Sequence, residues 1–192
     1  MTQRIPEWDA EGVLPPRDEA QPTAGVRSPY RVSLAALVER FATSPERVDI
    51  LRGFLEYRSA LHRVGLVSGF QWIDGSFSED VERVEGRAPR DVDVVSFVDR
   101  PSAAMQPPTD ADFEALDHDA AKVRFLVDGY IIEVDELSPR QLVAQSAYWY
   151  SLWSHRRSRR WKGFVQIELD PAQEGDAAFA LDARAGTLGE QA

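Results

Sequence analysis

Two aspartates in a valine-rich run, Asp91 and Asp93 in RDVDVV, are the residues of this chain whose type and spacing most directly indicate chemistry. Side chains on a strand alternate between its two faces, so both carboxylates point the same way while the valines beside them point into the core. Two carboxylates a few ångströms apart repel each other unless a cation lies between them. The pattern predicts a metal-binding strand, and a solvated strand edge is the alternative that it leaves open.

A second feature precedes these aspartates, where the apolar run FQWI leads through Asp74 into Gly75 and Ser76. Glycine lets the backbone approach a ligand closely, and the N-terminus of a helix favours negative charge. Residues 77 to 84 fit a short helix after this turn, because acidic residues lie where its positive end would be. Gly75 and Ser76 are therefore predicted to bind a phosphate, although an ordinary turn has the same residues.

A phosphate-binding turn beside a metal-binding strand supplies the parts for attack on the α-phosphate of a nucleoside triphosphate. Mg²⁺ usually binds a few carboxylates together with the phosphates of the substrate. A bound metal lowers the pKa of an attacking hydroxyl and stabilises the charge that develops at phosphorus. The two features together predict nucleotidyl transfer with Mg²⁺ or Mn²⁺ as the cofactor.

The segment FQWIDGSF, followed by RDVDVV, resembles the signature of the nucleotidyltransferase superfamily of the DNA polymerase beta type. The resemblance implies the nucleotidyltransferase fold, with Gly75 and Ser76 holding the β- and γ-phosphates and with Asp91 and Asp93 binding the metals. The spacer between the two motifs, residues 77 to 90, is long compared with that of the smaller members of the superfamily.

The same resemblance implies a third carboxylate on a later strand, which has to come from VRFLVDGYIIEVDE. Asp128 fits the pattern best, Glu133 is the rival, and Asp135 is a weaker candidate. Asp128 and Glu133 are separated by an odd number of residues, so they would face opposite sides of a regular strand. Only one of them can join Asp91 and Asp93, and the pattern favours Asp128 as the third metal ligand and the activator of the acceptor hydroxyl.

A narrower resemblance covers residues 5 to 169. The segments IPEWDAEGVLPP, WIDGSF with RDVDVV, and WKGFVQIEL are similar, in that order, to an uncharacterised bacterial family described as nucleotidyltransferase-like. This resemblance does not indicate which substrate the protein uses.

Positive charge is concentrated in one late segment, HRRSRRWK, residues 155 to 162. Cations at the end of a helix can simply complement its dipole. The functional alternative is that the segment reaches the triphosphate or an RNA-like acceptor. The candidates for that contact are Arg156, Arg157, Arg159, Arg160 and Lys162.

The elements that must position these residues alternate along the chain. Helices are predicted over residues 33–41, 44–64, 77–84, 109–122 and 138–155, and strands over 66–73, 91–98, 123–134 and 163–169. The strand over 123–134 is apolar on both faces and is therefore predicted to be interior to its sheet. This order favours an α/β (α+β) domain, a mixed sheet of three to four strands with helices packed on it.

Three parts are expected along the chain. Residues 1–31 are rich in proline and predict an extended N-terminal arm, in which Trp8 and Leu14 pack on the domain, or else a partly disordered tail. Residues 32–170 form the nucleotidyltransferase-like domain. Residues 171–192 lack a clear apolar period and predict a loosely ordered C-terminal tail.

The composition excludes several kinds of protein. The formal net charge is −10, so the surface as a whole repels nucleic acid and anionic lipid. The sequence has no cysteine, which excludes disulfides, thiolate zinc sites and cysteine nucleophiles. It also has no apolar run near about 18 residues and no signal-peptide core, so we expect a soluble cytoplasmic protein without a membrane partner.

The expected function is the transfer of a nucleoside monophosphate from a nucleoside triphosphate to an unidentified acceptor, which could be a small molecule, a tRNA or a protein. The main alternative is a catalytically silent module that binds a nucleotide or a partner protein, such as the antitoxin-like component of a bacterial defence pair. A metal-dependent phosphodiesterase with the same aspartates is a third hypothesis.

Overall fold

The computed structural model describes residues 4–17, 23, 25–101 and 107–190. Within this part the chain forms seven α-helices and five strands, joined in places by short 3-10 turns. The helices are α1 (Leu34–Phe41), α2 (Pro45–Arg63), α3 (Val81–Glu85), α4 (Asp110–Phe113), α5 (His118–Phe125), α6 (Pro139–Trp153) and α7 (Glu174–Gly189). The strands are β1 (Tyr30–Arg31), β2 (Gly69–Asp74), β3 (Val92–Val98), β4 (Val127–Glu133) and β5 (Val165–Glu168). No helix in the described ranges is both long and apolar enough to cross a membrane.

The strands form one mixed sheet in the order β1-β5-β2-β3-β4. Strand β2 runs antiparallel to both of its neighbours, β5 and β3, whereas β3 and β4 are parallel, as are β1 and β5. The predicted α+β class with a mixed sheet is confirmed. The sheet has five strands and not three to four, because the short β1 lies in the proline-rich arm, where two paired residues leave no periodic signal.

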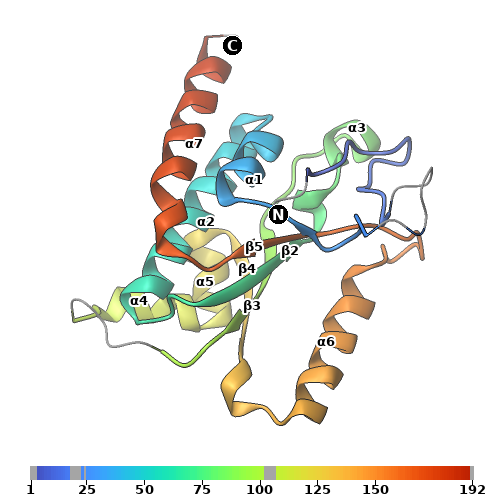
Figure 1. The fold of residues 1–192 in the computed structure, drawn as a ribbon. Helices are drawn as coiled ribbons and strands as arrows, with labels where there is room; N and C mark the ends of the chain where they lie inside the picture. The colour runs from blue at the N-terminus through green and yellow to red at the C-terminus, as the bar shows by residue number, and fades with distance from the viewer. Residues whose placement is uncertain (1–3, 18–22, 24, 102–106, 191–192) are drawn as a thin grey trace.

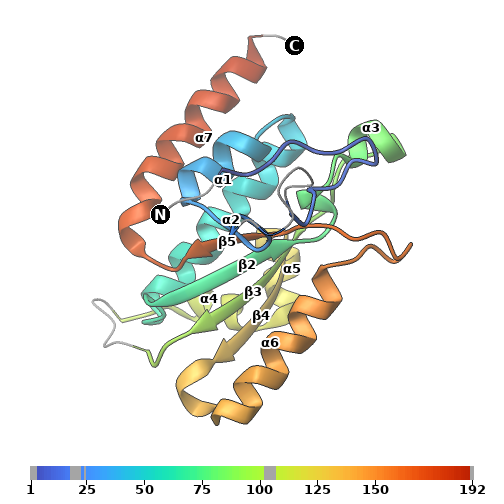
Figure 2. The same ribbon diagram turned by 45° about the vertical axis from the view of Figure 1, so that its right-hand side comes forward.

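Helices cover the two faces of the sheet unequally (Figures 1 and 2). Helices α1, α2, α5 and α7 share the larger core with inward-facing residues of the sheet such as Ile73 and Val94. Helix α6 lies on the opposite face, where Trp149 and Trp153 pack against Trp72 and Phe97. Residues of β2 and β3 with the parity of Trp72 and Phe97 therefore face α6.

The serines at the predicted starts of three helices act as N-caps. Ser33, Ser44 and Ser138 each accept a hydrogen bond from a backbone N–H in the first turn of α1, α2 and α6. Such a bond satisfies a donor that has no partner within the helix. The starts of these three helices were therefore readable from the sequence.

The single helix predicted over residues 109–122 is wrong. The chain forms α4, then a 3-10 turn over Glu114–Leu116, and then α5. The side chain of Asp117 accepts a hydrogen bond from the Ala120 N–H at 2.8 Å, so this aspartate starts a new helix instead of continuing the first. Leu126 then adopts a left-handed conformation with φ of 56° and ends α5, which delays the next strand until Val127.

Strand β4 was predicted to be interior to the sheet, and this is also wrong, because β4 is an edge strand. It is apolar on both sides because helices cover both of its faces. Val127 belongs to the larger core, and the ring of Tyr130 lies 4.8 Å from that of Trp149 in α6. Apolar residues on both faces indicate two covered faces, not two paired edges.

The prediction of a loosely ordered tail over residues 171–192 is wrong for residues 174–189, which form α7 and pack against α1 and α2 (Figure 1). Residues 191 and 192 lie outside the described ranges. Ala177 and Leu181 are its buried residues. Arg58 of α2 donates a hydrogen bond to Glu174 at 2.7 Å, which ties the start of the helix to the domain. The apolar period was too weak to detect because alanines, which are strong helix formers, allow close packing with few large side chains.

The N-terminal arm packs on the domain through the two residues predicted to do so. Leu14 is buried in the larger core. The indole N–H of Trp8 donates to the Ser78 carbonyl at 2.8 Å, and its ring lies 6.0 Å from that of Phe41. The arm thus contacts the segment that directly follows the Gly75-Ser76 turn.

Candidate functional site

Three aspartates lie side by side across the three neighbouring strands β2, β3 and β4. Asp74 is paired with Asp93 across the antiparallel β2 and β3, and Asp93 is paired with Asp128 across the parallel β3 and β4. Asp91 precedes β3 and shares the face of Asp93. We call Asp74, Asp91, Asp93 and Asp128 the acidic cluster. It lies on the face of the sheet that α6 covers, since Asp74 and Asp93 share the parity of Trp72 and Val95.

The turn between α5 and β4 sets this register. Leu126 accepts a hydrogen bond at 3.0 Å from the backbone N–H of Val92, the first residue of β3. Val127 then pairs with Val92, and the next residues to pair are Asp128 and Asp93. The left-handed conformation of Leu126 therefore aligns the carboxylates of two strands that lie far apart in the sequence.

Gly75 brings the backbone of the turn against the acidic cluster. It has φ of 80° and ψ of −164°, a backbone conformation that residues with a Cβ atom rarely adopt. A Cβ at this position would overlap the carboxylate of Asp93. The three residues Ser76–Ser78 form a 3-10 turn and not the start of a longer helix. The predicted helix is thus divided into this turn and α3.

Arg47 of α2 holds the segment that follows Ser76. Its guanidinium is fully buried and donates to the carbonyls of Phe77 and Glu79, each at 2.6 Å. It also forms an ion pair with Glu82 at 2.6 Å. Because an arginine has five donors in a fixed planar arrangement, these contacts fix the path of the chain after the turn.

The sequence contains only two lysines, Lys122 and Lys162, and both contact the acidic cluster. The ammonium of Lys122 lies 2.5 Å from Asp128 and 3.1 Å from Asp91. The ammonium of Lys162 is buried, 2.9 Å from Asp74 and 2.8 Å from Glu79. Each lysine therefore bridges two carboxylates, and these pairs are charge-assisted hydrogen bonds.

Asp93 is the central carboxylate and has the least compensation. No described side chain forms an ion pair with it, whereas the other three aspartates of the cluster each contact a lysine. Burial raises the pKa of the Asp93 carboxyl to about 7, and repulsion from Asp74, Asp128 and Asp91 contributes to the increase. Burial also raises the pKa of Asp74, although Lys162 opposes that effect. The metal-free site thus resists the ionisation of Asp93 at neutral pH.

The chemistry of these donors fits a hard divalent cation. The acidic cluster and Glu79 supply five carboxylates, and the permanent cations that contact them are Lys122, Lys162 and Arg156. The imidazole of His118 also lies 3.5 Å from Asp128. This leaves an excess of negative charge beside an unpaired carboxylate, and Mg²⁺ prefers carboxylate oxygens. In the described part of the chain, no three acidic or histidine side chains are yet arranged as a ligand set. Lys122 lies between two of the donors instead.

The cationic residues of the segment 155–162 lie in different parts of the structure, and only some of them are near the acidic cluster. Arg156 donates to Glu79 at 2.6 Å, and Glu79 also contacts Lys162, so these two cations adjoin the site. Arg160 pairs with Asp9 and Glu11 of the N-terminal arm. Arg157 and Arg159 are exposed, and no contact within the described ranges links Arg157 to the acidic cluster.

The rivals for the third carboxylate lie elsewhere. Glu133 is exposed at the far end of β4, paired with Val98, five residues along the strand from Asp128. Asp135 accepts a hydrogen bond from the backbone N–H of Arg100 at 2.9 Å. The structure therefore brings Asp128, and neither rival, beside Asp93.

Sequence reasoning missed the contributions of Asp74, Lys122 and Glu79. Asp74 was noted only as part of a turn, and its pairing with Asp93 depends on the register of β2. Lys122 lies on a helix that the sequence pattern did not separate from the helix before it. The signal that could have found the lysines is their rarity, since all other basic side chains apart from histidine are arginines.

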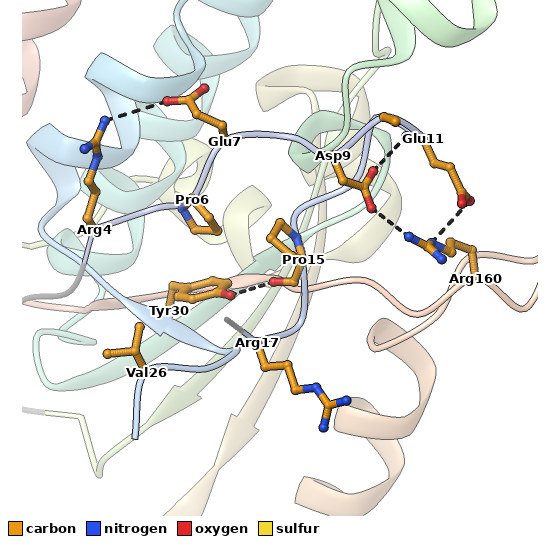
Figure 3. A pocket seen from close by; sticks show the side chains of 11 residues that line it. Arg4, Pro6, Glu7, Asp9, Glu11, Pro15, Arg17, Val26, Tyr30 and Arg160 are labelled. Atoms are coloured by element: carbon orange, nitrogen blue, oxygen red, sulfur yellow. Dashed lines mark hydrogen bonds and ion pairs between the residues drawn. The ribbon is translucent and has the colours of Figure 1, made fainter. Parts of the chain in front are cut away.

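A cavity of about 620 Å³ lies elsewhere, beneath the N-terminal arm (Figure 3). Tyr30 donates to the Pro15 carbonyl at 2.5 Å on one side of it, and Arg160 reaches Asp9 and Glu11 on the other. None of its lining residues belongs to the acidic cluster. The cavity follows from how the arm packs and adds no group to the site.

The fold and the site define an α+β domain in which three adjacent strands carry aspartates beside a glycine-serine turn. The chain belongs to a family of unknown function, DUF6932, whose model matches residues 6–168. This range contains all five strands and every residue of the acidic cluster. No curated protein and no solved structure matched the chain.

Proposed function

We propose that this protein is a divalent-cation-dependent nucleotidyltransferase of the DNA polymerase beta type. The observation that carries the proposal is the position of Asp93, which lies in register between Asp74 and Asp128 and against the backbone of Gly75. Within the described ranges it forms no ion pair. A carboxylate in that position is costly in a chain with no ligand, so it requires a functional explanation.

The topology around the site supports this assignment. Strand β2 ends at the Gly75-Ser76 turn, the antiparallel β3 carries Asp93, and the parallel β4 carries Asp128. This is the order that the resemblance implies: glycine-serine, then the aspartate pair, then a third carboxylate on a later strand. The basic residues Lys162 and Arg156 adjoin the same region through Glu79.

Each residue of the site has a role in the proposed reaction. Asp91, Asp93 and Asp128 would hold Mg²⁺ or Mn²⁺, which when bound lowers the pKa of the acceptor hydroxyl and neutralises charge on the phosphates. Gly75 lets the backbone approach the β- and γ-phosphates, and Ser76 adds a hydroxyl. Lys162 fixes Asp74 and Glu79 around the turn.

The transfer itself forms one bond and breaks one. The acceptor oxygen bonds to the α-phosphorus, the bond from that phosphorus to the bridging oxygen breaks, and pyrophosphate leaves with the electron pair. The hydroxyl proton would pass to a carboxylate of the site, and the pairing of Asp128 with Asp93 supports Asp128 in this role. The acceptor is a small molecule, a tRNA or a protein.

One observation favours a second candidate, a catalytically silent module that binds a nucleotide or a partner protein. Lys122 pairs with both Asp91 and Asp128, and the described side chains form no completed ligand set. A site that had lost its metal could keep its fold through such a lysine. A silent module predicts that substitution of Asp93 leaves the biological effect unchanged.

The proposal is tested by incubating the protein with each α-labelled nucleoside triphosphate, Mg²⁺ and a fractionated lysate. We expect one fraction to take the label, and its class identifies the acceptor. Asp93→Asn and Asp128→Asn should each reduce labelling by more than about a hundredfold, since both remove a ligand of the metal. Glu133→Gln is the matched control on the same strand and should label like wild type. If wild-type protein labels no fraction, the silent module is the better account.

A further inference from the structure

We infer that Lys122 is an internal counter-cation, which holds the metal-binding carboxylates in the nucleotide-free protein and competes with the divalent cation for them. This inference rests on the proposed function, because it assumes that Asp91, Asp93 and Asp128 bind the metal. It goes further by assigning Lys122 a regulatory role that makes metal binding depend on the presence of the nucleotide.

The position of the ammonium supports this role. Lys122 reaches from α5 to a carboxylate on β4 at 2.5 Å and to one before β3 at 3.1 Å. It therefore bridges two of the three proposed ligands, as a metal ion would. Asp93, the ligand that Lys122 does not contact, is half-buried and forms no ion pair with any described side chain.

The side chain of Lys122 can leave this position without a change in the fold. Its side chain is 45% exposed, so the ammonium can turn into solvent. Helix α5 is held independently by its buried residues Ala121 and Phe125. Only a flexible four-carbon side chain has to move, and a lysine gives up its contacts as a single point charge.

The choice of lysine is itself unusual in this chain. Of the 22 basic residues Lys and Arg, only Lys122 and Lys162 are lysines, and Lys162 is buried. An arginine at position 122 would bind a carboxylate through two parallel hydrogen bonds and would be harder to displace. A lysine provides the same charge in a form that a divalent cation can replace.

The consequence is a coupling between the metal and the nucleotide. A metal that arrives alone has to displace Lys122, which lowers its apparent affinity. A triphosphate brings negative charge that attracts the displaced ammonium, so the same displacement becomes favourable when metal and nucleotide arrive together. Nucleotide-free protein therefore keeps Asp91 and Asp128 paired with Lys122, and the metal enters with its substrate.

Binding of Mn²⁺ to nucleotide-free protein, followed by the electron paramagnetic resonance signal of free Mn²⁺, tests this inference directly. We expect Lys122→Met to bind Mn²⁺ roughly tenfold to a hundredfold more tightly than wild type, since a charge-assisted pair no longer competes. Arg124→Met removes a positive charge from the same helix and should bind Mn²⁺ like wild type, because Arg124 pairs with Glu114 and not with the cluster. Asp93→Asn combined with Lys122→Met should lose the added affinity.

The outcomes separate the inference from the function on which it rests. If wild type and Lys122→Met bind Mn²⁺ equally well, Lys122 is no competitor, while the metal site stands. If no variant binds Mn²⁺, with or without a nucleoside triphosphate, the proposed function fails together with the inference. Circular dichroism establishes that each variant is folded.

A second measurement uses wild-type protein and so avoids any loss of folding. Acetylation of Lys122 by an amine-reactive reagent is followed by peptide mass spectrometry, as the ratio of the acetylated to the unmodified form of the peptide that contains Lys122. Saturating Mn²⁺ should increase acetylation of Lys122 several-fold by freeing its ammonium. Unchanged acetylation in protein that has bound Mn²⁺ overturns the inference.

Discussion

At the scale of single residues, Asp93 determines the chemistry of the site. Its carboxylate lies between those of Asp74 and Asp128, and the ion pairs formed by Lys122 and Lys162 go to its neighbours. The ionised form of Asp93 therefore destabilises the metal-free fold. The same destabilisation favours a cation, because a bound cation relieves it.

This argument gives a pH dependence of stability. The pKa of Asp93 is raised to about 7 in the folded protein. Its ionisation therefore does not lower the free energy of unfolding below the ordinary pKa of an aspartate. The loss of stability grows as the pH rises and is complete above about pH 7. Asp93→Asn should raise the free energy of unfolding in EDTA by about 2 to 4 kcal/mol at pH 8, and hardly at all near pH 4. Urea denaturation at both pH values measures the difference.

The exposed Asp49 on α2 provides the matched control, since Asp49→Asn should change stability by less than about 0.5 kcal/mol at either pH. A loss of stability in Asp93→Asn at pH 8 would show that the half-buried carboxylate of Asp93 is compensated by its neighbours, and would contradict the destabilisation described above.

The sequence was informative about some of these residues and silent about others. The strand pattern predicted that Asp91 and Asp93 share a face, because strand periodicity is local. It could not predict that Asp74 lies opposite Asp93, since that depends on the register of β2 and β3. It also could not place Lys122, whose partners lie on two different segments.

At the scale of elements, the sequence predicted features that depend on neighbouring residues, and it did not predict features that depend on how elements pack together. The capped starts of α1, α2 and α6 were predicted, because a serine and its hydrogen bond lie within one turn. The edge position of β4 and the existence of α7 were missed. Both are decided by which elements cover a face, and a single periodic pattern does not contain that information.

Helix α7 gives a test at this scale. Leu181 is 3% exposed and lies in the larger core, whereas Phe179 on the same helix is 79% exposed. Leu181→Ala should lower the free energy of unfolding by about 2 to 4 kcal/mol, through lost burial and the cavity that remains. Phe179→Ala should change it by less than about 0.5 kcal/mol, although it removes the larger side chain.

Thermal or urea unfolding of the two variants measures these effects. If Leu181→Ala unfolds like wild type, α7 is not part of the domain's core, and the expectation of a loosely held C-terminal tail would be restored.

At the scale of the whole molecule, the site is assembled from segments that are distant in the sequence. Strands β2, β3 and β4 bring their aspartates into one row, α5 supplies Lys122, and the chain before β5 supplies Lys162. The N-terminal arm contacts the same region through Trp8 and the Ser78 carbonyl. With a formal net charge of −10, the protein can attract a triphosphate only through local cations or a bound metal.

The central claim is that the acidic cluster binds a divalent cation together with a nucleoside triphosphate. The most direct measurement is anomalous diffraction from crystals grown with Mn²⁺ and a triphosphate analogue that cannot transfer its α-phosphate. We expect an anomalous peak between Asp91, Asp93 and Asp128, with the β- and γ-phosphates at Gly75 and Ser76. The absence of a peak, with Asp91 and Asp128 still paired to Lys122 in crystals that contain the analogue, would contradict the account.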